Sequence, residues 1–227
     1  MMNRITVLLV DDHKLLRQGL RALLETEDDI TIAGEAENGR QAVEMACSLR
    51  PDVVVMDIAM KHMNGLEATR QITRKCPLIK IVILSSYCDD DYVQHLTEAG
   101  AVGYLVKESG ANDLSRALRE VHKGNTFFSP SIAKRLLSQY RQSPGHAGVA
   151  PQRKHHLTSR ENQVVQLVAE GQANKQIAAE LTLSIKTVQK YRQQVMDKLN
   201  IHETAGLTRY AIAKGMVECN LQESVLQ

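Results

Sequence analysis

Short, continuous apolar runs alternate with helical patterns through the first half of the chain. The runs are rich in β-branched residues, which is typical of strands buried on both faces of a parallel sheet. They predict strands at residues 5–10, 30–36, 53–56, 80–84 and 103–106. Amphipathic segments predict helices at residues 14–25, 39–49, 65–75, about 89–99 and about 112–123. Five strand–helix units indicate an α/β domain with a doubly wound, five-stranded parallel sheet.

The pattern becomes entirely helical beyond residue 128. Ser129 and Pro130 are suited to the N-cap and first position of a helix that runs to about residue 142. Residues 143–156 are rich in Gly and Pro and lack apolar periodicity, which predicts a flexible linker. We therefore expect one domain at 1–128, a linker helix and linker at 129–156, and a second domain at 157–227.

The second domain is predicted to be a small bundle of four helices. Thr158 and Glu161 have the spacing of a capping box, Asn174 and Ser184 are suited to cap the next two helices, and residues 203–214 form the fourth. The turn at residues 182–184 is short enough for a helix-turn-helix. The apolar residues of the last helix are expected to form either a dimer surface or part of the core.

Charge also differs between the two halves. Residues 1–128 carry 15 Lys and Arg against 19 Asp and Glu, a net charge of −4, whereas residues 129–227 carry 13 against 7, a net charge of +6. The basic half is suited to a polyanion. The four cysteines lack a CxxC spacing, so we expect neither disulfides nor structural zinc. No apolar run is long enough to span a bilayer, and we expect a cytoplasmic protein.

Polar residues follow the predicted strands at the ends where parallel sheets bind ligands. Asp11 and Asp12 follow the first strand, Asp57 the third, Ser85 the fourth and Lys107 the fifth. The carboxyl ends of parallel strands share one edge, so these side chains should converge. Three carboxylates together favour a cation, and all-oxygen ligation suits Mg²⁺. A carboxylate nucleophile, a lysine and a hydroxyl at one site are typical of phosphoryl transfer through an aspartyl-phosphate.

The motifs VLLVDDH, VVVMDIAM, VILSS and GYLVK occur in the order found in receiver domains of two-component response regulators, which residues 5–123 resemble. The resemblance implies a flavodoxin-like fold and a sensor histidine kinase that phosphorylates Asp57. It implies that Asp12, Asp57 and the backbone carbonyl of Ala59 ligate Mg²⁺, with Asp11 acting through water. It implies no enzymatic activity beyond slow autodephosphorylation.

The same resemblance assigns a switch around the phosphoryl group. Ser85 would donate a hydrogen bond to it, Lys107 would pair with it, and Tyr104 would turn inward as Ser85 moves. One position departs from the family, because Lys61 stands where proline is usual. We expect this change to loosen the loop after Asp57 and to place an ammonium near the acidic site.

Residues 157–214 resemble the LuxR-type helix-turn-helix of NarL/FixJ-type response regulators. The shared features are LTSRE, NKQIA, LTLSIKTV and MDKL. The resemblance implies regulation of transcription through sequence-specific binding to double-stranded promoter DNA as a homodimer.

The third helix of this domain is the candidate recognition helix, because its N-terminal half would enter the major groove. Glutamine can bond adenine and lysine can reach guanine, so we favour for base edges Gln189, Lys190 and Gln193. The residues favoured for phosphates are Lys186, Thr187 and Arg192, with Asn174 or Lys175 beside them. Family members often carry lysine at position 189. A merely solvated helix face is the competing interpretation.

Two other functions fit parts of the same sequence. A phosphohydrolase could use an aspartyl-phosphate on a similar sheet, but such enzymes commonly carry Asp-x-Asp, and position 59 is alanine. A regulator that responds without phosphorylation is the second alternative, for which Lys61 is the only indication. Stoichiometric labelling, turnover or no labelling by a phosphodonor distinguishes the three.

Overall fold

The computed structural model describes residues 4–86, 90–107, 111–134 and 157–217. The chain divides into two compact units, residues 1–149 and 150–227. The boundaries expected at 128 and 156 stay predictions. The expected linker and the end of the helix before it lie outside the described residues. None of the described helices is long and apolar enough to cross a membrane.

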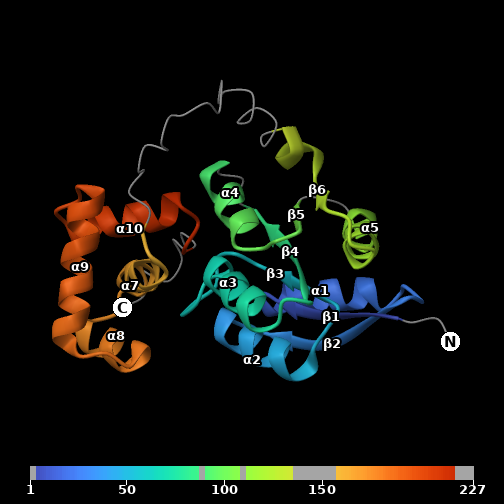
Figure 1. Ribbon diagram of the computed structural model, residues 1–227, viewed down its shortest axis with the longest axis horizontal. Coiled ribbons are helices and arrows are strands. Elements are labelled where there is room, and N and C mark those ends of the chain that lie inside the picture. Colours follow the sequence, from blue (N-terminus) through green and yellow to red (C-terminus); the bar gives the residue numbers. More distant parts are fainter. Residues whose placement is uncertain (1–3, 87–89, 108–110, 135–156, 218–227) are drawn as a thin grey trace. The chain divides into compact units, whose positions relative to one another are not determined.

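The first unit is built on a parallel sheet whose strand order is β2-β1-β3-β4-β5-β6 (Figure 1). The five strands expected from the sequence are confirmed, and a sixth was not predicted. The strands are β1 (Ile5–Val10), β2 (Ile30–Ala36), β3 (Val53–Met56), β4 (Lys80–Ser85), β5 (Gly103–Val106) and β6 (Phe127–Phe128). The order of the first five is that of a flavodoxin-like sheet, whose topological switch point lies between β1 and β3.

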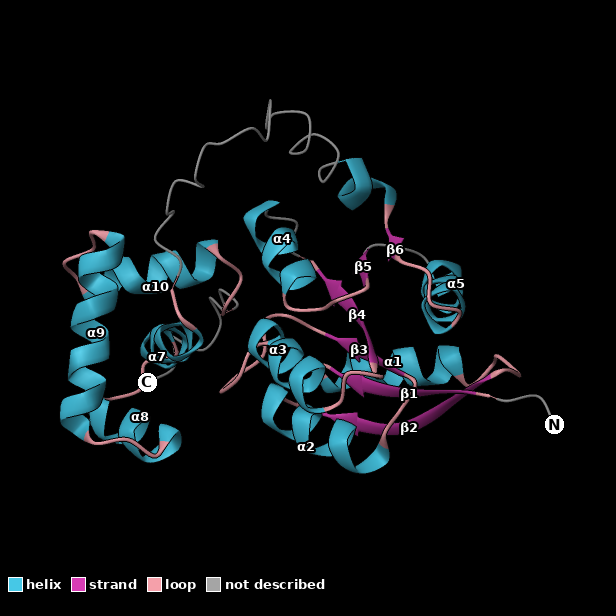
Figure 2. Ribbon diagram, viewed as in Figure 1, coloured by secondary structure: helices cyan, strands magenta, loops and turns pink. Residues whose placement is uncertain are grey.

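Five of the described helices cover the two faces of this sheet (Figure 2). They are α1 (Lys14–Leu24), α2 (Gly39–Leu49), α3 (Gly65–Lys75), α4 (Asp90–Glu98) and α5 (Ala111–His122). Asn38 and Asn64 cap α2 and α3, and each side chain accepts a backbone N–H three residues further on, at 3.0 Å. These caps fix where the helices begin after the strand-end loops.

Alternation along the strands divides the core into two layers. Leu8 and Val10 of β1 pack with α2, α3 and α4, whereas Val7 and Leu9 pack with α1 and α5. Both faces of each central strand are therefore buried, which explains the continuous apolar runs in the sequence. Polar side chains can emerge only at the strand ends.

Strand β6 was missed because two residues carry no detectable periodicity. Phe127 pairs with Gly103 and Phe128 with Tyr104. The Arg116 guanidinium lies over the Phe127 ring, 5.8 Å from its centroid. Residues 130–134 continue as a helix, and Ile132 is fully buried in the α2–α4 layer of the core. This helix therefore starts as part of the first unit.

The second unit contains the four expected helices, α7 (Ser159–Ala169), α8 (Asn174–Leu181), α9 (Ile185–Leu199) and α10 (Thr204–Ala213). The capping box of α7 and the Ser184 cap of α9 are confirmed. The expected cap of α8 is wrong, because Ala173 occupies the N-cap and the Asn174 side chain instead accepts from Arg192. In α10, Ala211 is fully buried in the core of this unit, with Tyr210 packed against that core.

Glu161 joins the start of α7 to the end of α9. Its carboxylate accepts the Thr158 N–H at 2.7 Å and lies 2.8 Å from Lys198 Nζ, although the residue is only 3% exposed. Burial by itself would raise the pKa of Glu161, but Lys198 and Thr158 outweigh burial and lower it. The charged form is therefore favoured in the folded state.

We expect Glu161→Gln to lower the free energy of unfolding of the second unit by about 1 kcal/mol, because it replaces the charge-assisted hydrogen bonds from Lys198 and Thr158 with weaker neutral ones. Chemical denaturation of the full chain measures the change. Glu203→Gln is the matched control, because the Glu203 side chain makes no capping bond. The folded-state pKa of Glu161 is depressed, so the deficit is complete above the unfolded value of about 4.3 and shrinks as pH falls through the folded value. An equal deficit at pH 7 and at pH 3 contradicts this account.

Candidate functional site

The carboxyl ends of β1, β3, β4 and β5 form one edge, and backbone hydrogen bonds fix its register. The Asp57 N–H donates to the Val10 carbonyl at 2.8 Å, and the Lys107 N–H donates to the Ser85 carbonyl at 3.0 Å. Asp57 is thereby set beside the end of β1, at the switch point of the sheet. The residues that follow these strands must share a small volume.

The acidic site is formed by Asp11, Asp12, Asp57 and Lys107. Lys107 Nζ lies 3.0 Å from Asp11 Oδ2 and 3.1 Å from Asp57 Oδ1. One ligand atom from each of Asp11, Asp12, His13 and Asp57 can be chosen so that all four lie within 4.8 Å of one another. Asp11 and Asp57 are each only 2% exposed. The predicted convergence of the three aspartates and the lysine is therefore confirmed.

Burial and mutual repulsion disturb the protonation of these groups. Burial is the main cause that raises the pKa of Asp57 to about 6; Lys107 lowers it and Asp11 raises it. Burial also raises the pKa of Asp12. The neighbouring His13 lowers this pKa, whereas Asp11 raises it further. Burial acts to lower the pKa of Lys107, but Asp57 and Asp11 outweigh burial and raise it. One ammonium therefore offsets only part of the negative charge.

The two oxygens of Asp57 differ in their surroundings. Oδ1 faces Lys107, whereas Oδ2 is buried without a hydrogen-bond partner among the described residues. A buried carboxylate oxygen that lacks a partner is costly. A hard divalent cation fits this arrangement, because the cluster offers oxygen ligands and excess negative charge.

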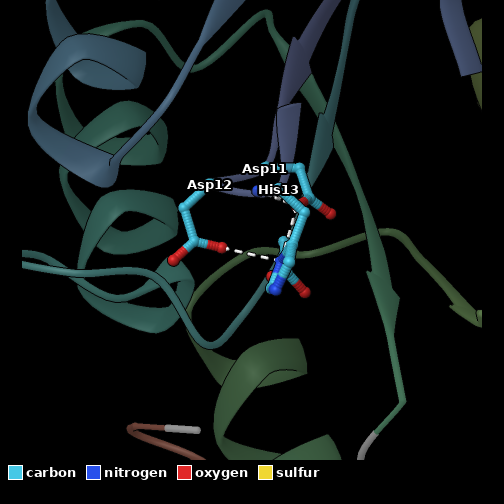
Figure 3. Close-up of side chains that lie close together, drawn as sticks. Asp11, Asp12 and His13 are labelled. Atoms are coloured by element: carbon cyan, nitrogen blue, oxygen red, sulfur yellow. Dashed lines mark hydrogen bonds and ion pairs between the residues drawn. The ribbon is translucent and has the colours of Figure 1, made fainter. Parts of the chain in front are cut away.

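Two residues near the cluster were not identified from the sequence. His13 Nδ1 lies 3.0 Å from Asp12 Oδ1 and 3.3 Å from Asp11 Oδ1 (Figure 3). Arg17 is 5% exposed and donates from Nη1 to the Asp11 carbonyl, while Nε contacts Glu35 at 3.1 Å. His13 could have been suspected from its place beside two aspartates, but a buried arginine on an amphipathic helix gives no such signal.

The loop after Asp57 packs tightly against the start of α3. Ala59 is buried and Lys61 is exposed. The Gly65 N–H donates to the Ile58 carbonyl at 2.8 Å, and a Cβ on Gly65 would lie 2.1 Å from the Asp57 carbonyl oxygen. Only glycine fits there, so Gly65 fixes the backbone of the acidic strand end. The effect of Lys61 on this loop stays a prediction.

Ser85 and Tyr104 belong to β4 and β5, the strands that end at the acidic edge. Ser85 is fully buried as the last residue of β4, and Tyr104 is 1% exposed in the core layer that faces α4. The residues with which they pair in the sheet, Val106 and Ile83, belong to neighbouring parallel strands. Their switch roles stay predictions.

The candidate recognition helix is α9. Val188 and Val195 are fully buried in the core of the second unit. The side chains left exposed on α9 include four predicted DNA contacts, namely Lys186, Gln189, Lys190 and Gln193. Lys175 is likewise exposed at the start of α8. This arrangement leaves a polar helix face with lysine and glutamine side chains.

The other predicted contacts are engaged within the protein. Arg192 Nη1 donates to Asn174 Oδ1 at 2.8 Å, and Nη2 donates to Thr204 Oγ1 at 3.0 Å. The Thr187 hydroxyl lies 2.8 Å from that of Ser184. Arg192 therefore links the starts of α8 and α10 to α9, a structural role that sequence reasoning missed.

Each of the two units matches a known protein family. The family model described as "Response regulator receiver domain" matches residues 7–119, and that described as "Bacterial regulatory proteins, luxR family" matches residues 155–211. Transcriptional regulatory protein LiaR of Bacillus subtilis (strain 168) is 41% identical over 207 residues, which cover 91% of this chain and 96% of LiaR. Transcriptional regulatory protein DegU of Brevibacillus brevis is 34% identical, with 95% and 96% covered.

Solved structures show the same likeness. RcsB from Salmonella enterica serovar Typhimurium, bound to a promoter in the presence of the phosphomimetic BeF3⁻, is 25% identical with a TM-score of 0.65, and 93% of this chain and 100% of that chain are covered. A LuxR-family response regulator from Aurantimonas sp. SI85-9A1 is 30% identical with a TM-score of 0.59, with 61% and 99% covered. A parallel α/β receiver domain followed by a helical C-terminal unit defines this class of regulatory protein. The chain belongs to the two-component response regulators with a LuxR-type DNA-binding domain.

We expect Gly65→Ala to lower the free energy of unfolding of the first unit by at least about 2 kcal/mol, since the added methyl group must displace the Asp57 backbone. Thermal or chemical denaturation of the full chain measures it. Gly19→Ala is the control, because a Cβ there meets nothing within 4 Å and alanine favours the helix by roughly 0.5–1 kcal/mol. If the two substitutions have equal effects, close packing at Gly65 does not position the site.

Proposed function

We propose that Asp57 accepts a phosphoryl group from a sensor histidine kinase and that this modification controls binding of the second unit to promoter DNA. The main observation in support of this proposal is that Lys107 Nζ lies within 3.1 Å of both Asp57 and Asp11 at the end of the parallel sheet. This arrangement holds a buried carboxylate beside a cation that can pair with an incoming phosphoryl group.

In the proposed reaction, Asp57 Oδ2 attacks phosphorus and the bond from phosphorus to the donor atom breaks. Oδ2 is suited to attack because it has no hydrogen-bond partner among the described residues, whereas Oδ1 is held by Lys107. The product is an acyl phosphate on Asp57. Lys107 pairs with the phosphoryl oxygens, and the Ser85 hydroxyl donates a hydrogen bond to one of them. Ser85 moves toward the phosphoryl group to make this bond, and Tyr104 turns inward as it does so.

The residues that would hold Mg²⁺ are Asp12, Asp57 and the backbone carbonyl of Ala59, with Asp11 acting through a water molecule. When bound, Mg²⁺ supplies positive charge next to the phosphoryl oxygens. The close approach of the carboxylate oxygens and the burial of Asp11 support this assignment. We infer slow autodephosphorylation and no other enzymatic activity.

We expect Asp57→Asn to abolish covalent labelling by a small acyl-phosphate donor, because an amide oxygen is a poor nucleophile. Intact-protein mass spectrometry measures the added phosphoryl group, which should reach one per chain and require Mg²⁺. Asp28→Asn, at an exposed aspartate away from the cluster, should leave labelling unchanged. Labelling of the Asp57→Asn chain overturns the acceptor assignment, and steady turnover of the donor favours the phosphohydrolase instead.

For the second unit, we propose that α9 enters the major groove of promoter DNA. Gln189, Lys190 and Gln193 are assigned to base edges, although Gln193 Nε2 also donates to Asp197 Oδ1 at 2.8 Å, and Lys186 and Thr187 are assigned to phosphates. The exposure of the lysine and glutamine side chains among these residues supports placing this face of α9 against DNA. Arg192 is assigned to phosphate contact together with Asn174 and Lys175, although its guanidinium also bonds Asn174 and Thr204. We further propose that the phosphorylated or DNA-bound protein is a homodimer.

We expect Gln189→Ala and Lys190→Ala each to weaken binding to a footprinted promoter site by about 1–3 kcal/mol, or roughly 5- to 150-fold, with relaxed sequence preference. Lys186→Ala should weaken binding to all sequences and reduce the salt slope by about one. Fluorescence anisotropy at several salt concentrations measures both effects. Lys123→Ala removes an exposed lysine of the first unit and should leave affinity unchanged. If the Gln189→Ala and Lys190→Ala chains both bind with full affinity, α9 is not the recognition helix.

A further inference from the structure

Two cysteines that are far apart in the sequence meet in the first unit. Cys47 lies near the end of α2 and Cys76 is the C-cap residue of α3, and their Sγ atoms are 2.9 Å apart. A disulfide bond is about 2.05 Å long, so roughly 0.9 Å of approach separates the thiol pair from a covalent bond. Both side chains are partly exposed and therefore open to small reagents.

Packing of α2 against α3 brings the two thiols together. The helices cover the same face of the sheet (Figure 1), and Ala46 and Ile72 are fully buried in the same core layer. Ala46 adjoins Cys47, and the Cys76 N–H donates to the Ile72 carbonyl at 2.7 Å. The two backbones are thus fixed by buried neighbours, so the sulfurs must come closer through rotation of their side chains.

We propose that Cys47 and Cys76 are a dithiol modification site that closes to an intrachain disulfide when a hydroperoxide oxidises it. In the first step a thiolate attacks the peroxide, the O–O bond breaks, and a sulfenic acid and an alcohol or water are formed. The second thiolate then attacks the sulfenic sulfur, the S–S bond forms, and the hydroxyl leaves as water. In total, two thiols and one hydroperoxide give one disulfide, one alcohol or water, and one further water.

Positive charges of Arg50 and Lys75 act on the Cys76 thiol. The hydrogen bond with Cys47 is the main cause that raises the pKa of Cys76; burial also raises it, whereas Arg50 and Lys75 lower it. Either thiol can make the first attack on the peroxide, and the other then acts as the resolving thiol.

The cross-link would close a ring that contains the proposed acceptor. Residues 47–76 include β3, Asp57, the loop after it and all of α3. A ring of this size restricts the unfolded chain, which stabilises the fold relative to the reduced form. Gly65 packs directly on the Asp57 backbone, so the ring ties both ends of the segment that positions the acidic site. The inference does not rest on phosphorylation of Asp57.

The test uses the full chain carrying Cys88→Ser and Cys219→Ser, which leaves only the proposed pair. After treatment with hydrogen peroxide, alkylation and digestion without reductant, we expect one peptide cross-linked between Cys47 and Cys76 and a mass lower by two hydrogens. Dithiothreitol should restore two alkylatable thiols. The oxidised chain should melt higher than the reduced chain by about 10 °C.

Adding Cys47→Ser to this background provides the control, which should lose the cross-linked peptide while retaining its circular dichroism spectrum. The unsubstituted chain is mapped in parallel, so that the outcome does not depend on folding of the serine variants. Two persistently alkylatable thiols, overoxidation without a cross-link, or a disulfide only between chains would each overturn the proposal.

Discussion

One ammonium between two buried carboxylates is the constraint on which the first unit depends. Lys107 lies within 3.1 Å of both Asp11 and Asp57, and Asp12 lies in the same cluster. Neither aspartate is stable in an apolar core without such a partner, yet one positive charge cannot neutralise three carboxylates. The fold therefore maintains an excess of negative charge at one edge, held in place by a hydrophobic sheet. That imbalance makes the edge receptive to a cation.

Contacts from the surrounding structure position this charged edge. Arg17 holds the backbone carbonyl of Asp11, and Gly65 lets α3 approach the backbone of Asp57 more closely than any side chain would permit. The same helix ends at Cys76, in contact with Cys47. The segment between β3 and the end of α3 is thus fixed at both ends. A backbone shift at one end of this segment must therefore be accommodated by the sheet and by the helices packed against it.

Much of both units was predictable because their signals are local. Buried parallel strands need continuous apolar runs, and the carboxyl ends of such strands share an edge, so the convergence of Asp57 with Lys107 followed from the order of the elements. The capping box at Thr158 followed from side-chain spacing alone. Asn174 failed as a cap because a distant arginine competes for its side chain, and no local pattern records that competition.

The sequence by itself determined the alternation of strands and helices, the charged strand ends and the exposed polar face of α9, since each depends on neighbours a few residues away. Only the tertiary structure decided which atoms meet. It brought Cys47 to Cys76, placed His13 beside Asp12, and added β6 to the sheet edge. These contacts join residues through helix packing and register, and distances across a packed core are set by the sum of many side-chain volumes rather than by any one stretch of sequence.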